Sequence, residues 1–252
     1  MIPHHTVEGP TDAPAVVFSG SLGTMLDMWR PQVAALADRF RVVRYDTRGH
    51  GGTPAGDEPF GIGDLADDIA RLLDHLSIER AHLVGLSLGG AIAIEFGARH
   101  PHRAGRLALL CTAATIATPD YWAERVDAVR ERGMAALAEP AMQRWFTDRF
   151  RAAHPDVVAE FRENFAACDP SGYVACCETL ARLDLHDRLA KLRSPALALY
   201  GAEDTLTTAT DAAILQRGIP DCEVVPIAAA KHLASAEQAR TVNKLLTDFL
   251  AK

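Results

Sequence analysis

The feature that most constrains the fold is the pentapeptide Gly85-Leu86-Ser87-Leu88-Gly89, which stands between a strand pattern and a helix pattern. Residues 81–84 read as a short buried strand, and residues 90–99 have the apolar spacing of a helix. A strand that enters a helix through such a turn bends so sharply that a side chain at either glycine would collide with neighbouring backbone. The turn holds Ser87 in strained geometry at the helix N-terminus, where the helix dipole favours negative charge. We therefore predict that Ser87 is a nucleophile, the alternative being a simple structural turn.

Strand and helix patterns alternate along most of the chain, which is typical of a parallel sheet covered by helices on both faces. Strands are expected at residues 13–18, 40–45, 81–84, 106–111, 196–200 and 223–227. The alternation stops at about residue 115 and resumes near residue 188, and the patterns between these points are helical. We expect an α/β core of residues 1–115 and 188–252, with residues 116–187 inserted as a helical cap.

The composition of the chain limits which partners it can bind and where in the cell it is expected. A length of 252 residues with 48% hydrophobic content suits one large globular domain. A net charge of −7 without a basic run argues against nucleic-acid binding. No apolar run reaches the ~18 residues of a membrane span, and the N-terminus lacks the features of a signal peptide. The five cysteines form no CxxC pair, which argues against a disulfide framework or a zinc site and favours a cytoplasmic location.

A serine hydroxyl becomes a nucleophile only with a general base, and the base needs a carboxylate to orient it. In open α/β sheets, functional groups gather at the carboxyl ends of the strands. Asp204 follows the strand expected to end at Tyr200, and His232 follows the strand expected to end at Ile227. We predict a triad in which Ser87 attacks, His232 is the base and Asp204 orients it.

Each triad position has a rival. Ten histidines are present, and His50 is the only other one in a loop at a strand end, although it precedes Ser87. Glu203 is the alternative to Asp204, with the ordinary interpretation of a solvated loop charge. Cys111 ends a predicted strand and is interpreted as a small buried filler rather than a reactive thiol.

Attack on a carbonyl creates an oxyanion, which about two hydrogen-bond donors must stabilise. The N–H of Leu88, directly after the nucleophile, is the first predicted donor. The second is expected from the loop of residues 19–23, and we assign it to the Ser21 N–H. The alternative interpretation of this loop is a simple glycine-rich turn. The loop is too short to be a phosphate-binding loop.

Together these residues resemble the α/β-hydrolase superfamily. The resemblance runs along the whole chain, through Ser19-Gly20, residues 46–51, residues 85–89, Gly201-Ala202-Glu203-Asp204 and His232. It implies an α/β-hydrolase fold with a mostly parallel eight-stranded sheet, flanking helices and a helical cap inserted after the sixth strand.

Within the superfamily the chain looks like the 3-oxoadipate enol-lactonases of bacterial aromatic catabolism. The motifs that carry this finer likeness are Leu22-Gly23-Thr24, Met28-Trp29, residues 45–51, residues 85–90, Trp122-Ala123-Glu124-Arg125, Arg144-Trp145-Phe146-Thr147, Gly172-Tyr173, Cys176-Cys177-Glu178 and His232-Leu233-Ala234 with Glu237-Gln238. Two positions depart from the pattern. Lys231 stands before His232 where a small residue is usual, and Ala239 stands where proline is common.

The likeness implies a carboxylic ester hydrolase that opens 3-oxoadipate enol-lactone to 3-oxoadipate through an acyl-enzyme, with no metal or organic cofactor. The substrate carries a free carboxylate, which requires a cation or donors in the pocket. Candidate substrate-binding residues are Leu22, Trp122, Arg125, Arg144 and Trp145, and Arg149 is a further candidate for the carboxylate. The alternatives are a broader carboxylesterase, another lactonase and, more remotely, a non-catalytic ligand receptor. The oligomeric state is left open.

Overall fold

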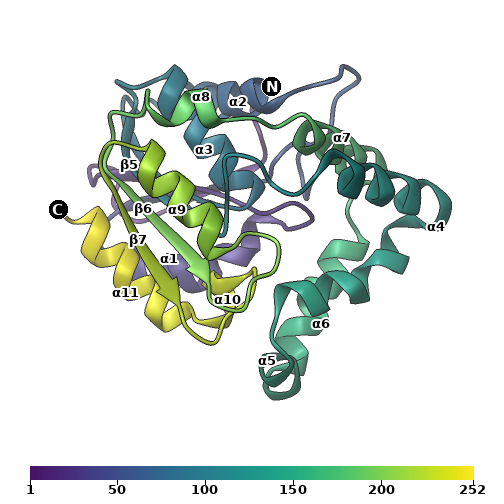
Figure 1. The fold of residues 1–252 in the computed structure, drawn as a ribbon. Helices are drawn as coiled ribbons and strands as arrows, with labels where there is room; N and C mark the ends of the chain where they lie inside the picture. The colour runs from purple at the N-terminus through teal and green to yellow at the C-terminus, as the bar shows by residue number, and fades with distance from the viewer.

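A twisted sheet of seven strands forms the centre of the computed structural model, which describes residues 1–252 (Figure 1). The strand order is β1-β3-β2-β4-β5-β6-β7, and every neighbouring pair is parallel except β1 with β3. The strands are β1 His5–Glu8, β2 Ala15–Ser19, β3 Arg41–Tyr45, β4 Ala81–Leu86, β5 Ala104–Leu110, β6 Ala196–Gly201 and β7 Cys222–Ile227.

The α/β-hydrolase architecture predicted from the sequence is confirmed, but the predicted count of eight strands is wrong by one. The residues ahead of β2 hold only β1, which ends at Glu8 and is followed by Gly9, with a positive φ of 89°, and by Pro10. This segment is too short for a second strand. The strand that precedes the inserted helices is therefore the fifth in the chain and not the sixth.

Helices cover both faces of the sheet. One face carries α2 Ile62–His75, α3 Leu88–Arg99, α8 His186–Leu189 and α9 Ala209–Gly218. The other face carries α1 Arg30–Leu36 and α11 Ala239–Leu250, with the short η1 Leu26–Trp29 and α10 Ala234–Glu237 beside them. The central strands are therefore buried on both faces, which explains why they are apolar along their length. In β2, for example, Val16, Val17 and Phe18 are fully buried.

Of the five helices between β5 and β6, the first four extend away from one end of the sheet (Figure 1). They are α4 Pro119–Trp145, α5 Asp148–Ala153, α6 Pro155–Ala166 and α7 Pro170–Ala181, and we call them the cap. The side chains of Thr118, Thr147 and Asp169 accept backbone N–H groups at the starts of α4, α5 and α7. Local capping therefore sets where these helices begin.

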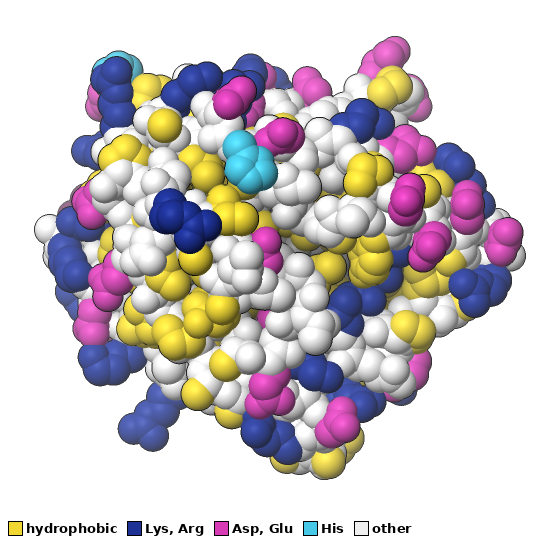
Figure 2. Space-filling model, viewed as in Figure 1, with side chains coloured by type: hydrophobic (Ala, Val, Ile, Leu, Met, Phe, Trp, Pro, Cys, Tyr) yellow, Lys and Arg dark blue, Asp and Glu magenta, His cyan; other side chains and the backbone are white.

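The cap sits directly on the core through α7. A Cβ atom added to Gly172 would lie 2.2 Å from the Cα of Gly49, so only glycine permits this approach. Nearby, the Thr179 hydroxyl donates to the carbonyl of Phe60 at 3.0 Å. Figure 2 shows acidic and basic side chains intermixed over the face of core and cap that it presents. None of the helices is both long and apolar enough to cross a membrane.

Candidate active site

Ser87 occupies a strained turn between β4 and α3. Its backbone has φ 56° and ψ −114°, in a region that residues other than glycine rarely adopt. A Cβ atom on Gly85 would lie 2.2 Å from the Gly89 carbonyl oxygen, and one on Gly89 would lie 2.1 Å from the Ser19 carbonyl oxygen. Both flanking glycines are therefore required for the turn, which holds Ser87 at the N-terminus of α3.

His232 and Asp204 meet beyond the ends of β7 and β6. Nδ1 of His232 lies 2.7 Å from Oδ2 of Asp204, and both side chains are almost fully buried. Asp204 also accepts the Leu206 N–H at 2.9 Å and the Thr207 hydroxyl at 2.6 Å. Burial alone would raise the pKa of Asp204, but His232 and these hydrogen bonds outweigh it and lower that pKa. An ionised Asp204 accepts a hydrogen bond from Nδ1–H of His232, which leaves the Nε2 lone pair free to act as a base.

Ser87 and His232 line one small cavity between the core and the cap. The cavity is lined by Ser21, Leu22, Ser87, Tyr121, Trp122, Arg125, Arg144, Trp145, Tyr173, Leu206 and His232. The structure thus brings together all five candidate substrate-binding residues, the nucleophile and the base. Asp204 lies behind His232, outside the lining.

The two predicted oxyanion donors have no acceptor inside the protein. Leu88 is the first residue of α3, where a helix leaves its N–H groups unpaired. Neither the Leu88 N–H nor the Ser21 N–H donates a hydrogen bond to another protein group. Ser21 lines the cavity with Ser87. Both amides therefore lack a protein acceptor, as donors reserved for an oxyanion would.

His50 supports the loop of Ser21 instead of acting as a base. Its Nε2 accepts the Gly23 N–H at 2.9 Å, and its Nδ1 donates to the Arg48 carbonyl at 3.0 Å. Burial lowers the pKa of His50, which keeps the ring neutral and suits this pair of bonds. With both nitrogens engaged, His50 has no lone pair for Ser87, which removes the sequence-based rival to His232.

Two arginines face the cavity without a carboxylate partner. Nε of Arg125 donates to the Tyr173 hydroxyl at 3.1 Å, and its guanidinium lies 5.8 Å and 5.7 Å from the ring centroids of Tyr121 and Tyr173. The Arg144 side chain makes no hydrogen bond or ion pair with another protein group, although it lines the cavity. Its burial and the positive charge of Arg125 lower the pKa of its guanidinium. Partly buried cations without counter-ions suit an anionic ligand.

The other candidate arginine lies outside this cavity. Arg149, at the start of α5, is 56% exposed in its side chain and pairs with Glu203 at 2.7 Å. Glu203 therefore points to the surface and not to His232. The structure thus separates Arg149 from Arg144 and Glu203 from Asp204.

The sequence reasoning missed three residues that line the cavity, namely Tyr121, Tyr173 and Leu206. Tyr121 lies one turn before Arg125 on α4, so helical spacing from that arginine could have found it. Tyr173 lies in a motif noted for its resemblance but was assigned no role. Leu206 lies in the loop after β6, and nothing in the sequence marks it.

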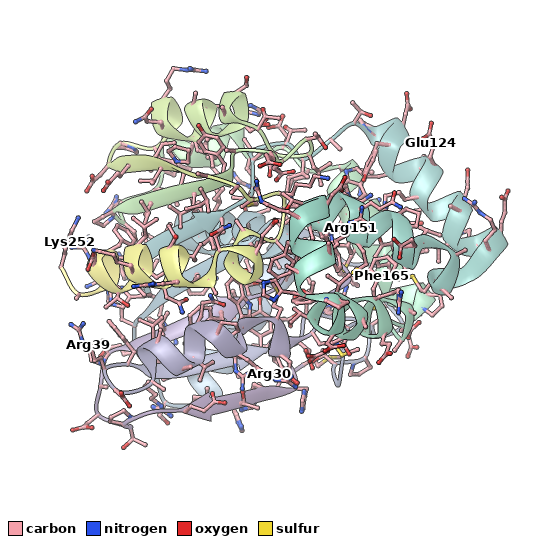
Figure 3. All side chains as sticks on the ribbon, turned by 90° about the horizontal axis from the view of Figure 1, so that it is seen from below. Arg30, Arg39, Glu124, Arg151, Phe165 and Lys252 are labelled. Carbon is pink, nitrogen blue, oxygen red and sulfur yellow. The ribbon has the colours of Figure 1, made fainter.

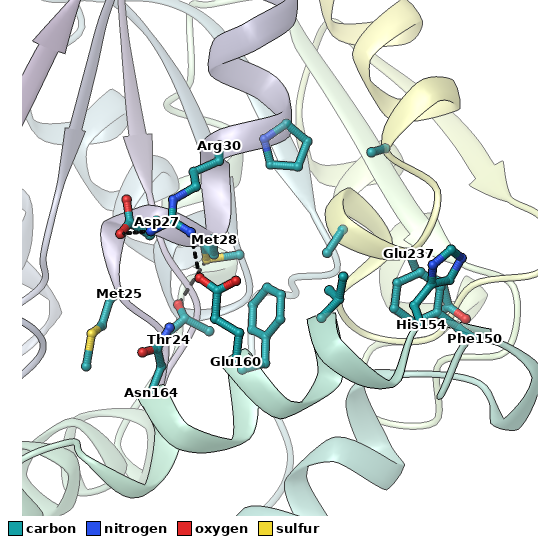
Figure 4. Close-up of a pocket in the computed structure, with 15 residues that line it drawn as sticks. Thr24, Met25, Asp27, Met28, Arg30, Phe150, His154, Glu160, Asn164 and Glu237 are labelled. Atoms are coloured by element: carbon teal, nitrogen blue, oxygen red, sulfur yellow. Dashed lines mark hydrogen bonds and ion pairs between the residues drawn. The ribbon is translucent and has the colours of Figure 1, made fainter. Parts of the chain in front are cut away.

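A larger pocket lies apart from this cavity, between η1 and α1 of the core and α5 and α6 of the cap (Figure 4). Arg30 spans its rim, with bonds to Glu160 of α6 at 2.6 Å and to Asp27 at 2.5 Å. Figure 3 places Arg30 at the side of the core that faces the cap. The pocket contains no nucleophile paired with a base, so size does not identify the catalytic cavity.

Comparisons with known proteins show the family of this chain. The family described as alpha/beta hydrolase fold matches residues 14–239. The chain belongs to this family. It is 37% identical to 3-oxoadipate enol-lactonase 1 of Acinetobacter baylyi, in an alignment that covers 97% of this chain and 91% of that protein.

Solved structures show the same likeness. The enol-lactonase from Burkholderia xenovorans superimposes with a TM-score of 0.96 at 39% identity and covers 99% of this chain and 96% of that one. A thermophilic esterase from Thermogutta terrifontis, solved with malate bound, has a TM-score of 0.92 at 28% identity and covers 98% and 92%. The likeness to each of these proteins therefore extends through the cap.

Proposed function

We propose that this protein is a serine hydrolase that opens the lactone ring of 3-oxoadipate enol-lactone to give 3-oxoadipate. The observation that carries the proposal is the presence of two arginines without counter-ions in the cavity of Ser87 and His232. The serine and histidine support acyl chemistry, and the arginines support a substrate with a carboxylate. The likeness to two proteins named as enol-lactonases supports the identity of that substrate.

In the first step, Oγ of Ser87 attacks the lactone carbonyl carbon while Nε2 of His232 takes its proton. Asp204 remains ionised and stabilises the imidazolium that forms. The N–H groups of Ser21 and Leu88 donate to the oxyanion, and each such donor contributes about 2.7–4 kcal/mol in other enzymes. The helix dipole of α3 acts in the same direction.

Collapse of this intermediate breaks the ring C–O bond and expels the enol oxygen, which takes a proton from His232. The enol becomes a ketone, and the opened chain stays esterified to Ser87. A water molecule then gives a proton to His232 and attacks the acyl carbon. The C–Oγ bond breaks as Ser87 takes that proton back from His232, which releases 3-oxoadipate. Substrate, water and these residues account for every atom and proton, so the scheme calls for no metal or organic cofactor.

Arg144 is the residue we assign to the substrate carboxylate. Arg125 already donates to Tyr173, whereas the Arg144 guanidinium has all its donors available. Trp145 packs edge-on against Phe165, with ring centroids 5.5 Å apart. We propose that Leu22, Trp122 and Trp145 form the apolar walls around the ring and that Arg125 adds positive charge beside Arg144.

Replacement of Arg144 by methionine tests the assignment, because methionine keeps an unbranched chain and removes the charge. We expect Arg144→Met to lower kcat/KM for the enol-lactone by at least about tenfold, or about 1.4 kcal/mol, mostly through KM. Hydrolysis of p-nitrophenyl acetate, which has no carboxylate, should change less than about threefold. The matched control is Arg149→Met, which removes an exposed cap arginine and should leave both rates unchanged. Equal losses on both substrates with Arg144→Met would contradict the assignment.

A broader carboxylesterase is the second candidate, favoured by the likeness to the Thermogutta esterase. Such an enzyme would use the same Ser87, His232 and Asp204. Two esters separate the candidates, namely mono-p-nitrophenyl adipate and p-nitrophenyl hexanoate, which differ only in a terminal carboxylate. A broad esterase would hydrolyse both at similar rates, whereas the proposed lactonase should prefer the adipate ester.

The cysteines bear on the compartment. All five are free, and four of them are buried. Burial raises the pKa of the Cys177 thiol to about 12 and also raises that of Cys111, which keeps both thiols protonated and unreactive. Free thiols in this number suit a reducing compartment, so we place the reaction in the cytoplasm.

A further inference from the structure

A buried carboxylate outside the catalytic groups joins the cap to the loop that carries His232. Glu237, in α10, is 7% exposed and forms no ion pair. Its Oε1 accepts the Thr147 N–H at 3.1 Å and also the Thr147 hydroxyl. Its Oε2 accepts the Lys231 N–H at 2.9 Å. One oxygen therefore serves the cap and the other serves the residue next to His232.

Two further hydrogen bonds run beside this carboxylate. They join the residues that flank His232 to the residues that flank Arg144. Nζ of Lys231 donates to the carbonyl of Gln143 at 2.9 Å, and the N–H of Leu233 donates to the carbonyl of Trp145 at 3.1 Å. The segment of residues 143–147 is thus bonded along its length to the segment of residues 231–237.

Lys231, which departs from the pattern of related sequences, gains a physical explanation here. Gln143 lies in the last turn of α4, where backbone carbonyls lack partners within the helix. A lysine ammonium at a helix C-terminus satisfies such a carbonyl and interacts favourably with the helix dipole. A small residue at position 231 could not reach it.

We propose that Glu237 is a positioning residue, which holds the cap segment of Arg144 at a set distance from His232 and Ser87. The proposal rests on the role of Arg144 proposed above. Only a carboxylate can accept on both sides, because a glutamine would turn an NH2 group toward either Thr147 or Lys231, which are themselves donors there. Two donors that face each other in a buried place without an acceptor are costly. Glu237→Gln should therefore break the contact either to Thr147 of the cap or to Lys231 beside His232.

The test compares mono-p-nitrophenyl adipate with p-nitrophenyl hexanoate. We expect Glu237→Gln to lower kcat/KM for the adipate ester by about tenfold, mainly through KM, as the loss of a hydrogen bond to a charged group predicts. The hexanoate ester should change less than about threefold, because it does not use Arg144. Thr147→Val removes the hydroxyl that donates to Glu237 and caps α5 but keeps the Thr147 N–H bond to Glu237. It should give the same selectivity change at a smaller size, which covers the case that Glu237→Gln fails to fold.

The matched control is Glu160→Gln, which also removes a glutamate between cap and core. Its partner Arg30 is exposed, so both esters should keep their rates. In the Arg144→Met background, Glu237→Gln should lower kcat/KM for the adipate ester only slightly further. Both residues act through the same contact, which is that of Arg144 with the substrate carboxylate. Equal losses on both esters, or unchanged kinetics in both Glu237→Gln and Thr147→Val, would overturn the positioning role. A wild-type enzyme without preference for the adipate ester would instead contradict the function proposed for Arg144.

Discussion

Asp204 and Glu203 are adjacent carboxylates that the fold uses in different ways. Asp204 is buried against His232 at 2.7 Å, whereas Glu203 pairs with Arg149 at the surface. We expect Asp204→Asn to lower kcat by several orders of magnitude, on the scale of ~10⁴ in other triads, because an amide stabilises the wrong tautomer of His232. Glu203→Gln should keep nearly full activity. Rates on p-nitrophenyl acetate and thermal unfolding of both variants would check this, and a nearly active Asp204→Asn enzyme would contradict the triad.

Individual residues could be predicted from the sequence where their position just beyond a strand indicated a chemical role. The order of Ser87, Asp204 and His232, each just beyond a strand, was sufficient to name groups that the structure brings together. The hydrogen bonds of His50 and Glu237 could not be predicted in the same way. Each depends on partners far along the chain, such as Gly23 for His50 and Thr147 for Glu237, and no local pattern encodes that contact.

At the scale of elements, the bend in α4 decides which cap side chains reach the cavity. The backbone leaves helical geometry at Gly133, with φ 73° and ψ 173°. Arg125 and Arg144 lie 19 positions apart in the sequence, so a straight helix would separate them by about 28 Å at 1.5 Å per residue. Both nevertheless line the same cavity. The bend therefore brings the two guanidinium groups together.

Gly133→Ala tests this dependence on the bend. No atom lies within 4 Å of an added Cβ, so the change introduces strain and no clash. Extended backbone at positive φ is nearly confined to glycine and costs another residue about 1–3 kcal/mol, so we expect a lower melting temperature and a raised KM for mono-p-nitrophenyl adipate. Gly56→Ala is the control, because Gly56 also has positive φ and lies outside the cavity. If both variants keep the wild-type KM, the bend does not control the approach of the arginines.

The strands and the cap also differ in how well the sequence predicts them. The buried parallel strands are continuous apolar runs, and all six expected runs overlap a strand by most of their length, with β4 extending two residues further. β1 was not among the expected strands, because its four residues at the edge of the sheet carry little apolar signal. A positive φ at Gly133 cannot be distinguished from an ordinary helical glycine by sequence, so the path of the cap was not predictable.

For the whole molecule, the core supplies the nucleophile and base while the cap supplies the charged groups. Ser87 and His232 come from loops at the carboxyl ends of strands, and Arg125 and Arg144 come from α4. The cap is seated by the close approach of Gly49 and Gly172 and by the hydrogen bonds of Glu237. We therefore expect the core to determine the type of reaction and the cap to determine which substrate is bound.

Whether this protein is an enol-lactonase is tested by kcat/KM on freshly generated 3-oxoadipate enol-lactone, beside p-nitrophenyl acetate and a homoserine lactone. We expect a preference of about 10³-fold or more for the enol-lactone, or about 4 kcal/mol of differential transition-state binding. Comparable rates on all three substrates, or no turnover of the enol-lactone, would contradict it.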